Sequence, residues 1–362
     1  MAKIKNIEFS NFRNFKYFKT TFNNNLNIFF GDNGSGKTNI LEGISLIAKG
    51  RGIRNSNISN LIKNKKENFK IRNTLEIQKN NFDVEIYANK NNDKYKKIIK
   101  INDDTSKESL DYLNNSVSFL TFLPEMERLF QTSPIYRRNF LDRLIFSGRN
   151  DYNKLINKYK KYLFERNKIL QNDSFDTNWL NQIEKDISKI GFEIYESRYL
   201  QLKLLNSNLN SLENSIKFKF SISFEMKDIF FDKNLNIDKY ILKLKDTRHI
   251  DKASGGTKIG PHKSDFLVSI NDGFEASLLS TGQQKTIVLM MLLAQCNLLI
   301  KEKNITPILL LDEIGSHLDI NNRKLILDMI NEFDIQFFLT GTEKNLFSFV
   351  STNAKFYNIS NI

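Results

Sequence analysis

The segment Gly31–Thr38, with the sequence GDNGSGKT, constrains the fold more than any other feature of the chain. It follows the apolar stretch 26–30 and comes directly before a helical pattern that begins at Lys37. Glycines at this spacing between a strand and a helix let backbone N–H groups surround phosphate oxygens at the helix N-terminus. The sequence therefore predicts a P-loop, and with it a nucleotide site.

Every residue of this loop is expected to contact the nucleotide: Gly31, Asp32, Asn33, Gly34, Ser35, Gly36, Lys37 and Thr38. The Lys37 ammonium is expected to reach the β- and γ-phosphates, and the Thr38 hydroxyl to bind Mg²⁺. ATP and Mg²⁺ are therefore the predicted cofactors.

A second feature near the end of the chain fits the same chemistry. The apolar stretch 308–311 is followed by Asp312 and Glu313. Taken alone, such a pair is often a helix cap with a solvated neighbour, but a P-loop site needs a second strand that carries an acid. We expect Asp312 to hold Mg²⁺ through water and Glu313 to polarise the attacking water. The predicted catalytic residues are Glu313, Lys37 and Asp312, and the predicted metal ligands are Thr38 and Asp312.

The two ends of the chain alternate between strand and helix patterns. Residues 1–30 suggest two strands joined by a turn, and residues 71–101 alternate apolar and polar side chains as antiparallel strands do. Buried strands then alternate with helices in the order 287–300 (helix), 308–311 (strand), 323–330 (helix) and 336–339 (strand). Apolar strands separated by helices predict a parallel sheet that is covered on both faces.

The middle of the chain has a different character, which begins near residue 108. Apolar residues follow a helical period from 152 to 170 and again from 180 to 212, with a polar break at 172–174. We therefore expect a helical hairpin whose second helix is about 50 Å long, followed by a strand over 217–226. The predicted domains are a lobe made of 1–107 and 251–362, and an inserted helical lobe over 108–250.

The chain has a formal net charge of +13, for which two interpretations remain open. The charge fits attraction to a polyanion such as nucleic acid. It also fits the Lys-, Asn- and Ile-rich composition that an AT-rich genome gives to any protein. The longest apolar stretch, 287–300, is shorter than a membrane span, and the first residues resemble a strand rather than a signal peptide. We therefore expect a cytoplasmic protein with no membrane partner.

Between the P-loop and the acid pair lies the segment 279–285, LSTGQQK, which resembles the signature LSGGQ of ABC ATPases. Thr281 replaces the first glycine of that signature. The resemblance implies an ABC-type P-loop ATPase lobe of the α/β class, in which a mixed sheet includes antiparallel N-terminal strands. It also implies that Ser280, Gly282 and Gln283 contact the γ-phosphate held by the P-loop of a second copy.

Two later segments match the family in part. Residues 316–319 (SHLD) stand where the family has its D-loop, and Thr342 stands where many members have a histidine that touches the γ-phosphate. The absence of that histidine predicts slow hydrolysis. The insert between Lys37 and Ser280 holds a short hairpin, whereas SMC proteins carry a long coiled coil there and transporter ATPases a compact insert.

Over essentially its whole length the chain resembles the RecF family of bacterial recombination mediators. The resemblance rests on NFRNF at 11–15 before the P-loop, LPE at 123–125, YRRNFLD at 136–142 and GPHKSD at 260–265. The cluster Arg137, Arg138 and Arg143 is either a solvated helix face or part of a site. The segment Gly260–His262 is either a tight turn or part of a site.

The RecF resemblance implies a cytoplasmic, DNA-binding protein of recombinational repair and replication restart with weak, DNA-dependent ATPase activity. ATP would clamp two copies into a head-to-tail homodimer on double-stranded DNA next to single-stranded DNA. With RecO and RecR, the dimer would help RecA to load at single-strand gaps. Two alternatives remain: another SMC-like ATPase that acts on chromosomes, or the ATPase subunit of a transporter.

Overall fold

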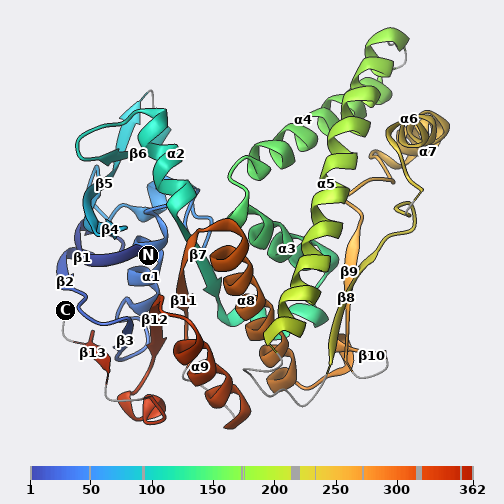
Figure 1. Ribbon diagram of the computed structural model, residues 1–362. Helices are drawn as coiled ribbons and strands as arrows, with labels where there is room; N and C mark the ends of the chain where they lie inside the picture. The colour runs from blue at the N-terminus through green and yellow to red at the C-terminus, as the bar shows by residue number, and fades with distance from the viewer. Residues whose placement is uncertain are drawn as a thin grey trace. The chain divides into compact units, whose positions relative to one another are not determined.

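A computed structural model describes residues 2–48, 50–91, 94–172, 174, 176–212, 221–232, 234–270, 273–314, 320–350 and 353–360, with the backbone alone at 89–91, 94, 320 and 321. The chain divides into two compact units. The first contains Met1–Glu127 and Thr281–Ile362, and the second contains Arg128–Glu213 and Lys217–Ser280. The two ends of the chain, blue and red in Figure 1, thus fold together in the first unit.

The first unit contains an antiparallel sheet in the order β2-β1-β4-β5-β6. Its strands are β1 (Ala2–Phe12), β2 (Phe15–Thr21), β4 (Lys70–Ile77), β5 (Asn80–Asn91) and β6 (Lys94–Ile101). The sequence prediction of two strands over 1–30 was wrong, because the region contains three: β1, β2 and β3 (Leu26–Phe30). A tight turn after Phe12 separates β1 from β2. Asn11 and Arg13 adopt positive φ angles of 54° and 52° there, at positions where no glycine or proline signals a turn.

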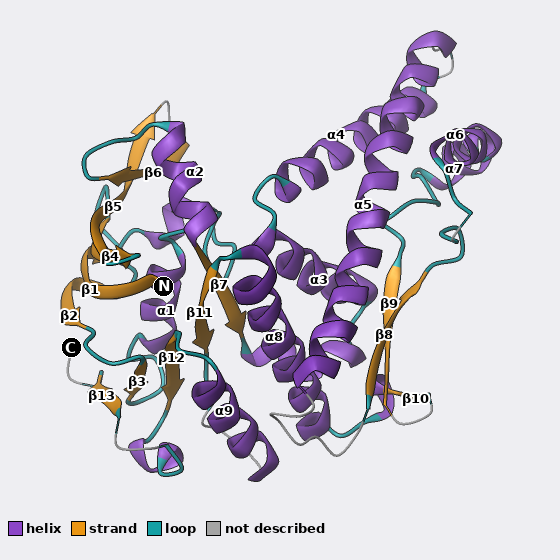
Figure 2. Cartoon of the chain, viewed as in Figure 1, coloured by secondary structure: helices purple, strands orange, loops and turns teal. Residues whose placement is uncertain are grey.

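The same unit contains a parallel sheet in the order β13-β3-β12-β11-β7. Its strands are β3 (Leu26–Phe30), β7 (Val117–Phe122), β11 (Thr306–Leu311), β12 (Gln336–Gly341) and β13 (Ala354–Asn358). The helices of this unit are α1 (Lys37–Ser45), α2 (Lys107–Ser116), α8 (Thr281–Lys303) and α9 (Ile320–Glu332). The predicted α/β ATPase fold is confirmed, with its antiparallel and parallel strands in separate sheets (Figure 2).

Two close contacts hold the sheets and the P-loop helix together. The buried side-chain amide of Gln336 in β12 accepts a hydrogen bond from the Ile4 backbone N–H (2.8 Å) and donates one to the Ile4 carbonyl (2.9 Å). Helix α1 contacts both β1 and β12. A Cβ atom at Gly43 would lie 2.4 Å from the ring of Phe9, so only glycine lets α1 pack this closely on β1.

Helix α8 begins six residues before the predicted stretch and ends three residues after it. By length and composition alone the whole helix, which is longer than the apolar stretch 287–300, would pass as a membrane span. However, 89% of its most apolar window is buried inside the protein. The burial is that of a core helix, and the only cysteine, Cys296, is fully buried within it.

The second unit contains the predicted helical hairpin, formed by α4 (Tyr152–Gln171) and α5 (Thr177–Leu212). The 36 residues of α5 span about 54 Å. The other helices are α3 (Pro134–Gly148), α6 (Ile237–Asp246) and α7 (Arg248–Ser254), and the strands β8 (Ile222–Lys227), β9 (Asp265–Ile270) and β10 (Phe274–Glu275) form a sheet in the order β10-β9-β8. The strand predicted over 217–226 matches β8 in part, and 217–220 lie outside the described residues.

The family strings YRRNFLD and GPHKSD contact each other within this unit. The Arg137 guanidinium pairs with the Asp265 carboxylate (2.6 Å), and Arg138 donates a hydrogen bond to the Ser264 carbonyl (2.7 Å). Asp142 accepts two hydrogen bonds from the buried Arg198 (2.8 and 2.9 Å). Arg137 and Arg138 therefore fix α3 to β9 and the turn before it, instead of forming a solvated face.

The turn at Gly260 packs against two buried tyrosines. Gly260 has a φ of 125°, and a Cβ atom there would lie 2.2 Å from the Tyr240 hydroxyl and 2.3 Å from the Tyr159 hydroxyl. The Tyr159 hydroxyl contacts Nδ1 of His262 (2.9 Å), and Nε2 of His262 lies 2.8 Å from the Thr257 carbonyl. Burial lowers the pKa of His262 to about 4, so the ring is neutral at physiological pH and this segment serves packing.

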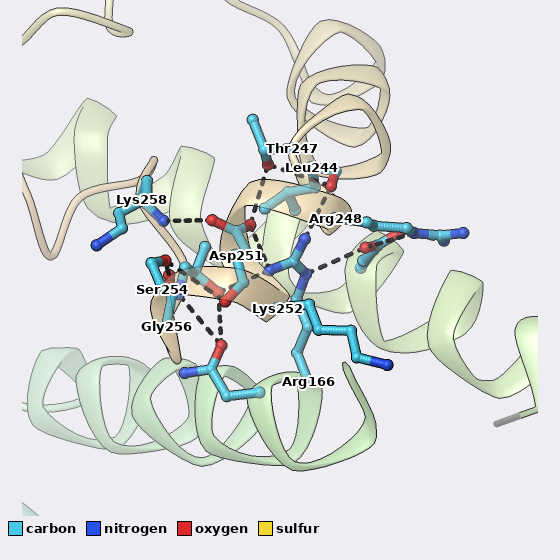
Figure 3. A network of polar contacts seen from close by, with 12 residues as sticks. Arg166, Leu244, Thr247, Arg248, Asp251, Lys252, Ser254, Gly256 and Lys258 are labelled. Carbon is cyan, nitrogen blue, oxygen red and sulfur yellow. Dashed lines mark hydrogen bonds and ion pairs between the residues drawn. The ribbon is translucent and has the colours of Figure 1, made fainter. Parts of the chain in front are cut away.

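A buried ion network ties α4 to the segment that follows α6 (Figure 3). The fully buried Arg166 guanidinium donates to Glu184 (3.0 Å), to Asp251 (2.8 Å) and to the Leu244 carbonyl (2.8 Å). Arg248 adds a second pair with Glu184. Two guanidinium groups thus face two carboxylates, so that every charge in this dry region has a partner.

The chain passes from one compact unit to the other after Glu127 and after Ser280, whereas the predicted domain boundaries are 107/108 and 250/251. Residues 108–122 include strand β7, which pairs with β11 in the parallel sheet of the first unit. Residues 251–280 include β9 and β10, which belong to the sheet of the second unit. Strand pairing, which the sequence pattern does not reveal, therefore decides where the units meet along the chain.

Arg166→Met is expected to destabilise the second unit by about 3–5 kcal/mol, because it leaves Asp251 and Glu184 buried with fewer partners. Urea unfolding followed by the fluorescence of Trp179, the only tryptophan of the chain, measures the change in this unit. The control is Lys168→Met at an exposed position of the same helix, where we expect a change of at most about 0.5 kcal/mol. Equal stability of both variants would contradict the role of the network.

Candidate nucleotide site

The P-loop lies between β3 and α1, where the sequence predicts it. Gly31, Gly34 and Gly36 have φ angles of 149°, 84° and 110°. A Cβ atom at Gly36 would lie 2.6–2.8 Å from side-chain atoms of Asn14 and Phe15, so the loop needs glycine there for space as well as for conformation. The loop thus ends at the N-terminus of α1, where unpaired N–H groups favour an anion.

The Lys37 ammonium is buried and points back into the loop. It donates hydrogen bonds to the carbonyls of Gly31 (2.7 Å) and Asp32 (2.8 Å). Burial lowers the pKa of Lys37, and the nearby carboxylates of Glu313 and Asp312 oppose this shift. The ammonium therefore lies at the centre of the loop, held by backbone carbonyls.

The acid pair lies beside the P-loop. The Asp312 carboxylate follows β11 and accepts hydrogen bonds from the hydroxyls of Thr38 (3.0 Å) and Thr340 (2.7 Å). The Thr340 hydroxyl also accepts a hydrogen bond from the Glu313 N–H (2.7 Å). Glu313 adopts a positive φ of 49°, which is uncommon for a residue with a side chain. The predicted residue Thr38, in the first turn of α1, thus contacts Asp312, and Glu313 follows directly after it.

The surroundings of Asp312 disfavour the charged form of its carboxylate. Burial raises the pKa of Asp312, and the hydrogen bonds from Thr340 and Thr38 oppose this shift. The neighbouring Glu313 carboxylate raises the pKa of Asp312 further. A carboxylate in this position gains from a cation beside it.

The donor set fits a magnesium–nucleotide. The Ser35 hydroxyl oxygen is buried and has no hydrogen-bond partner, as expected for a group that faces a ligand phosphate. Thr38 and Asp312 offer a hydroxyl and a carboxylate, and Mg²⁺ prefers oxygen ligands supplied by one or two protein groups together with phosphates. No cluster of three or more His, Cys, Asp or Glu side chains suited to a metal occurs among the described residues.

The remaining P-loop positions are exposed: Asp32, Asn33 and Gly34. The Asp32 N–H donates to the Ser360 hydroxyl (3.0 Å) near the end of the chain. Asn14 donates to the Ser35 carbonyl (3.0 Å). Sequence reasoning named no role for Ser360 or Asn14, because each meets the loop only through the tertiary fold.

An ion pair between α1 and the turn after β1 was also not predicted from the sequence. The fully buried carboxylate of Glu42 in α1 pairs bidentately with Arg13, at 2.7 Å for both hydrogen bonds. Arg13 also donates to the Ser56 hydroxyl (2.7 Å) and to the Asn60 carbonyl (2.8 Å). The family string NFRNF contains Arg13 and so indicates one member of this ion pair. The sequence pattern does not indicate its partner, Glu42.

The signature segment begins α8. Ser280 is exposed, and Gly282 and Gln283 lie in the first turn of the helix. The buried side chain of Asn322 in α9 donates to the Gly282 carbonyl (3.3 Å) and accepts from the Thr286 hydroxyl (2.9 Å). Within the part of the chain that the structure describes, the Asp312 carboxylate accepts its hydrogen bonds from Thr38 and Thr340.

The structure describes one of two further predicted features, Thr342, and not the other, the D-loop segment. Thr342 lies next to the P-loop, since its carbonyl accepts a hydrogen bond from the Gly31 N–H (3.2 Å). The D-loop segment 316–319 lies outside the described residues. Thr342, which stands where many family members have a histidine, is thus a neighbour of the P-loop.

Comparison with known proteins supports the same family over the whole chain. Residues 3–361 match the family model for the RecF/RecN/SMC N terminal domain. A Rickettsia typhi protein named DNA replication and repair protein RecF is 36% identical over 345 residues, which is 94% of each chain. A Rickettsia prowazekii protein of the same name is 35% identical over 346 residues, again 94% of each chain.

Two solved structures are similar to this chain over nearly its whole length. A structure described as the recombination mediator protein RecF-ATPrS in the RecFOR pathway matches with a TM-score of 0.85 and 27% identity, over 99% of this chain and 97% of that one. An SMC head bound to the C-winged helix domain of ScpA matches with a TM-score of 0.53 and 15% identity, over 98% of this chain and 94% of that one, and shows the fold alone. By the family model and by these relatives, the chain belongs to the RecF family.

Proposed function

We propose that the protein is an ATP-dependent DNA-binding protein of recombinational repair and replication restart. The observation that carries this proposal is the contact of the Thr38 hydroxyl with the Asp312 carboxylate beside a complete P-loop. The relatives are named DNA replication and repair proteins, and one matching structure is described as RecF-ATP in the RecFOR pathway. ATP and Mg²⁺ are the proposed cofactors.

Each residue of the site has a separate role in this proposal. The P-loop N–H groups and the Lys37 ammonium bind the phosphates, and Thr38 and Asp312 hold the metal. Mg²⁺, when bound, neutralises charge on the phosphate oxygens. Glu313 orients the attacking water, because Thr340 fixes its backbone N–H next to the Asp312 carboxylate.

A second copy completes the site in this proposal. Ser280 is exposed at the start of α8, and a helix N-terminus offers N–H groups to a phosphate. Two copies joined head to tail would each present Ser280, Gly282 and Gln283 to the P-loop of the other. Thr342, which replaces the usual histidine, supplies no imidazole to the γ-phosphate, so we expect the enzyme to be a slow ATPase that is stimulated by DNA.

The DNA part of the proposal rests on the family and on the net charge of +13. The proposed substrate is double-stranded DNA next to single-stranded DNA, and the proposed partners are RecR, RecO and RecA in the cytoplasm. The helical hairpin and Thr342 weigh against a transporter subunit. Binding to RecR would distinguish this protein from other SMC-like ATPases.

DNA binding is expected to depend on both salt and ATP. If the protein contacts about six phosphates, its affinity for duplex DNA should fall on the order of a thousandfold between roughly 50 and 200 mM salt. It should also rise when ATP is added, if the dimer forms the binding surface. Fluorescence anisotropy of labelled duplex and gapped DNA tests both effects, and an affinity indifferent to salt and ATP would favour the compositional origin of the charge.

Glu313→Gln and Lys37→Met should separate hydrolysis from binding. Glu313→Gln is expected to bind ATP normally and to lose turnover on the order of a hundredfold or more, because the amide cannot accept a proton from water. Lys37→Met should bind ATP poorly, because an apolar side chain would replace the buried ammonium. Calorimetric titration and phosphate release measure the two effects. Turnover within a few-fold of wild type in Glu313→Gln would remove that residue from its proposed role.

Ser280→Arg tests the head-to-tail arrangement. The substitution leaves the P-loop untouched, so a monomer should bind ATP almost normally. It should block ATP-dependent dimerisation and hydrolysis, because a bulky side chain would occupy the place of the partner's γ-phosphate. Titration at concentrations too low for dimerisation and sedimentation with ATP measure the two properties.

Mixing Ser280→Arg with Lys37→Met provides the matched test. A heterodimer of the two variants has one site with both lesions and one site with neither, so some dimerisation or turnover should return. Loss of ATP binding by the Ser280→Arg monomer would show that Ser280 acts within its own chain, and the head-to-tail model would fail.

A further inference from the structure

The second unit contains an apolar groove of about 650 Å³ that plays no part in the proposed nucleotide site. Its lining comes mainly from α5 and from the segment that follows β8. Its apolar lining consists of Phe192, Tyr199, Leu200, Phe231 and Leu235. A volume of this size admits one or two large side chains of a ligand.

The wall of the groove is held in place before any ligand binds. The Asp228 carboxylate accepts hydrogen bonds from the backbone N–H groups of Phe230 (2.6 Å) and Phe231 (2.9 Å). The same carboxylate accepts a hydrogen bond from the Tyr195 hydroxyl of α5 (3.0 Å), and the ring of Phe231 stacks on that of Tyr195 at 4.8 Å. A preformed wall reduces the ordering cost of binding.

The groove leaves apolar surface in water. Leu200 on its α5 side is 55% exposed. Ile229, two residues before Phe231 in the wall segment, is fully exposed. Exposed apolar side chains that gather at a groove with a polar rim are typical of interaction sites.

The described lining of the groove carries more carboxylates than guanidinium groups, although the protein has a net charge of +13. Among the described residues, three carboxylates, those of Glu193, Glu196 and Asp232, line the groove with one guanidinium, that of Arg149. The Lys203 ammonium also lies 5.0 Å from the ring centre of Tyr199. Arg149 already pairs with Glu193 and with Asp151. Among the described residues, Glu196 and Asp232 form no ion pair, and both are exposed. Glu196 and Asp232 therefore offer two exposed carboxylates to a cationic ligand.

We propose that this groove docks a segment of a partner protein in which a large apolar side chain is flanked by lysine or arginine. The apolar side chain enters between Leu200 and Phe231, and the flanking cations face Glu196 and Asp232. This inference does not rest on the nucleotide site, because every residue that carries it belongs to the second unit.

The test uses the full chain and three labelled peptides. The probe is acetyl-Lys-Arg-Leu-Phe-Lys-Arg-amide. One comparison peptide has glutamates in place of the four cations, and the other has serines in place of Leu and Phe. In fluorescence anisotropy we expect the probe to bind more tightly than both, and its affinity to fall with salt. Equal binding of all three peptides would overturn the proposal.

Matched variants locate the site. The double variant Glu196→Lys with Asp232→Lys should weaken binding of the probe on the order of tenfold or more. The control is Glu67→Lys with Glu108→Lys, which changes the net charge equally at exposed positions of the first unit. A control that weakens binding as much as the groove variant would reduce the effect to net charge and overturn the proposal.

A second pair of variants tests the apolar contact. Leu200→Ser should weaken binding of the probe several-fold, whereas Leu242→Ser, at a position that is 61% exposed in α6, should leave it unchanged. ATP affinity and the urea midpoint followed by the fluorescence of Trp179 should both be those of wild type in all four variants, which shows that each unit is folded. Unchanged binding by Leu200→Ser would contradict docking in this groove.

Discussion

The candidate site depends on one carboxylate that joins three distant segments. Asp312 at the end of β11 accepts hydrogen bonds from Thr38 in α1 and from Thr340 in β12. These segments meet only because β3, β12 and β11 are neighbours in the parallel sheet. The first and last parts of the chain must therefore pair before the P-loop and the acid pair form one site, and everything between β7 and α8 is an insertion into that sheet.

Local patterns predicted the parts of this site, and tertiary contacts supplied the rest. The P-loop and the acid pair were predictable because each combines an apolar strand with an adjacent motif whose chemistry is fixed by its spacing. Thr340, Ser360 and Glu42 were not, because each acts through a partner far away in the sequence. The turn between β1 and β2 was missed for a different reason, since Asn11 and Arg13 adopt positive φ without any glycine.

The second unit shows how a motif can characterise a family without contributing chemistry. Arg137 pairs with Asp265, and Gly260 fits against the hydroxyls of Tyr159 and Tyr240. Such positions tolerate few alternatives, because a Cβ atom or an unpaired charge there has no space or no partner. Arg166 obeys the same constraint, but a single arginine in an amphipathic helix looks exposed in the sequence, so its burial was not predictable.

The distribution of charge separates two kinds of contact on one protein. A net charge of +13 attracts a polyanion from a distance, but it does so without selecting a place on the surface. The exposed carboxylates of Glu196 and Asp232 instead mark one place on the surface, beside an apolar groove. Carboxylates attract cations and repel phosphates, so we expect a cationic protein segment rather than DNA at this groove. On this proposal, DNA and a cationic protein segment would bind at different places on the chain.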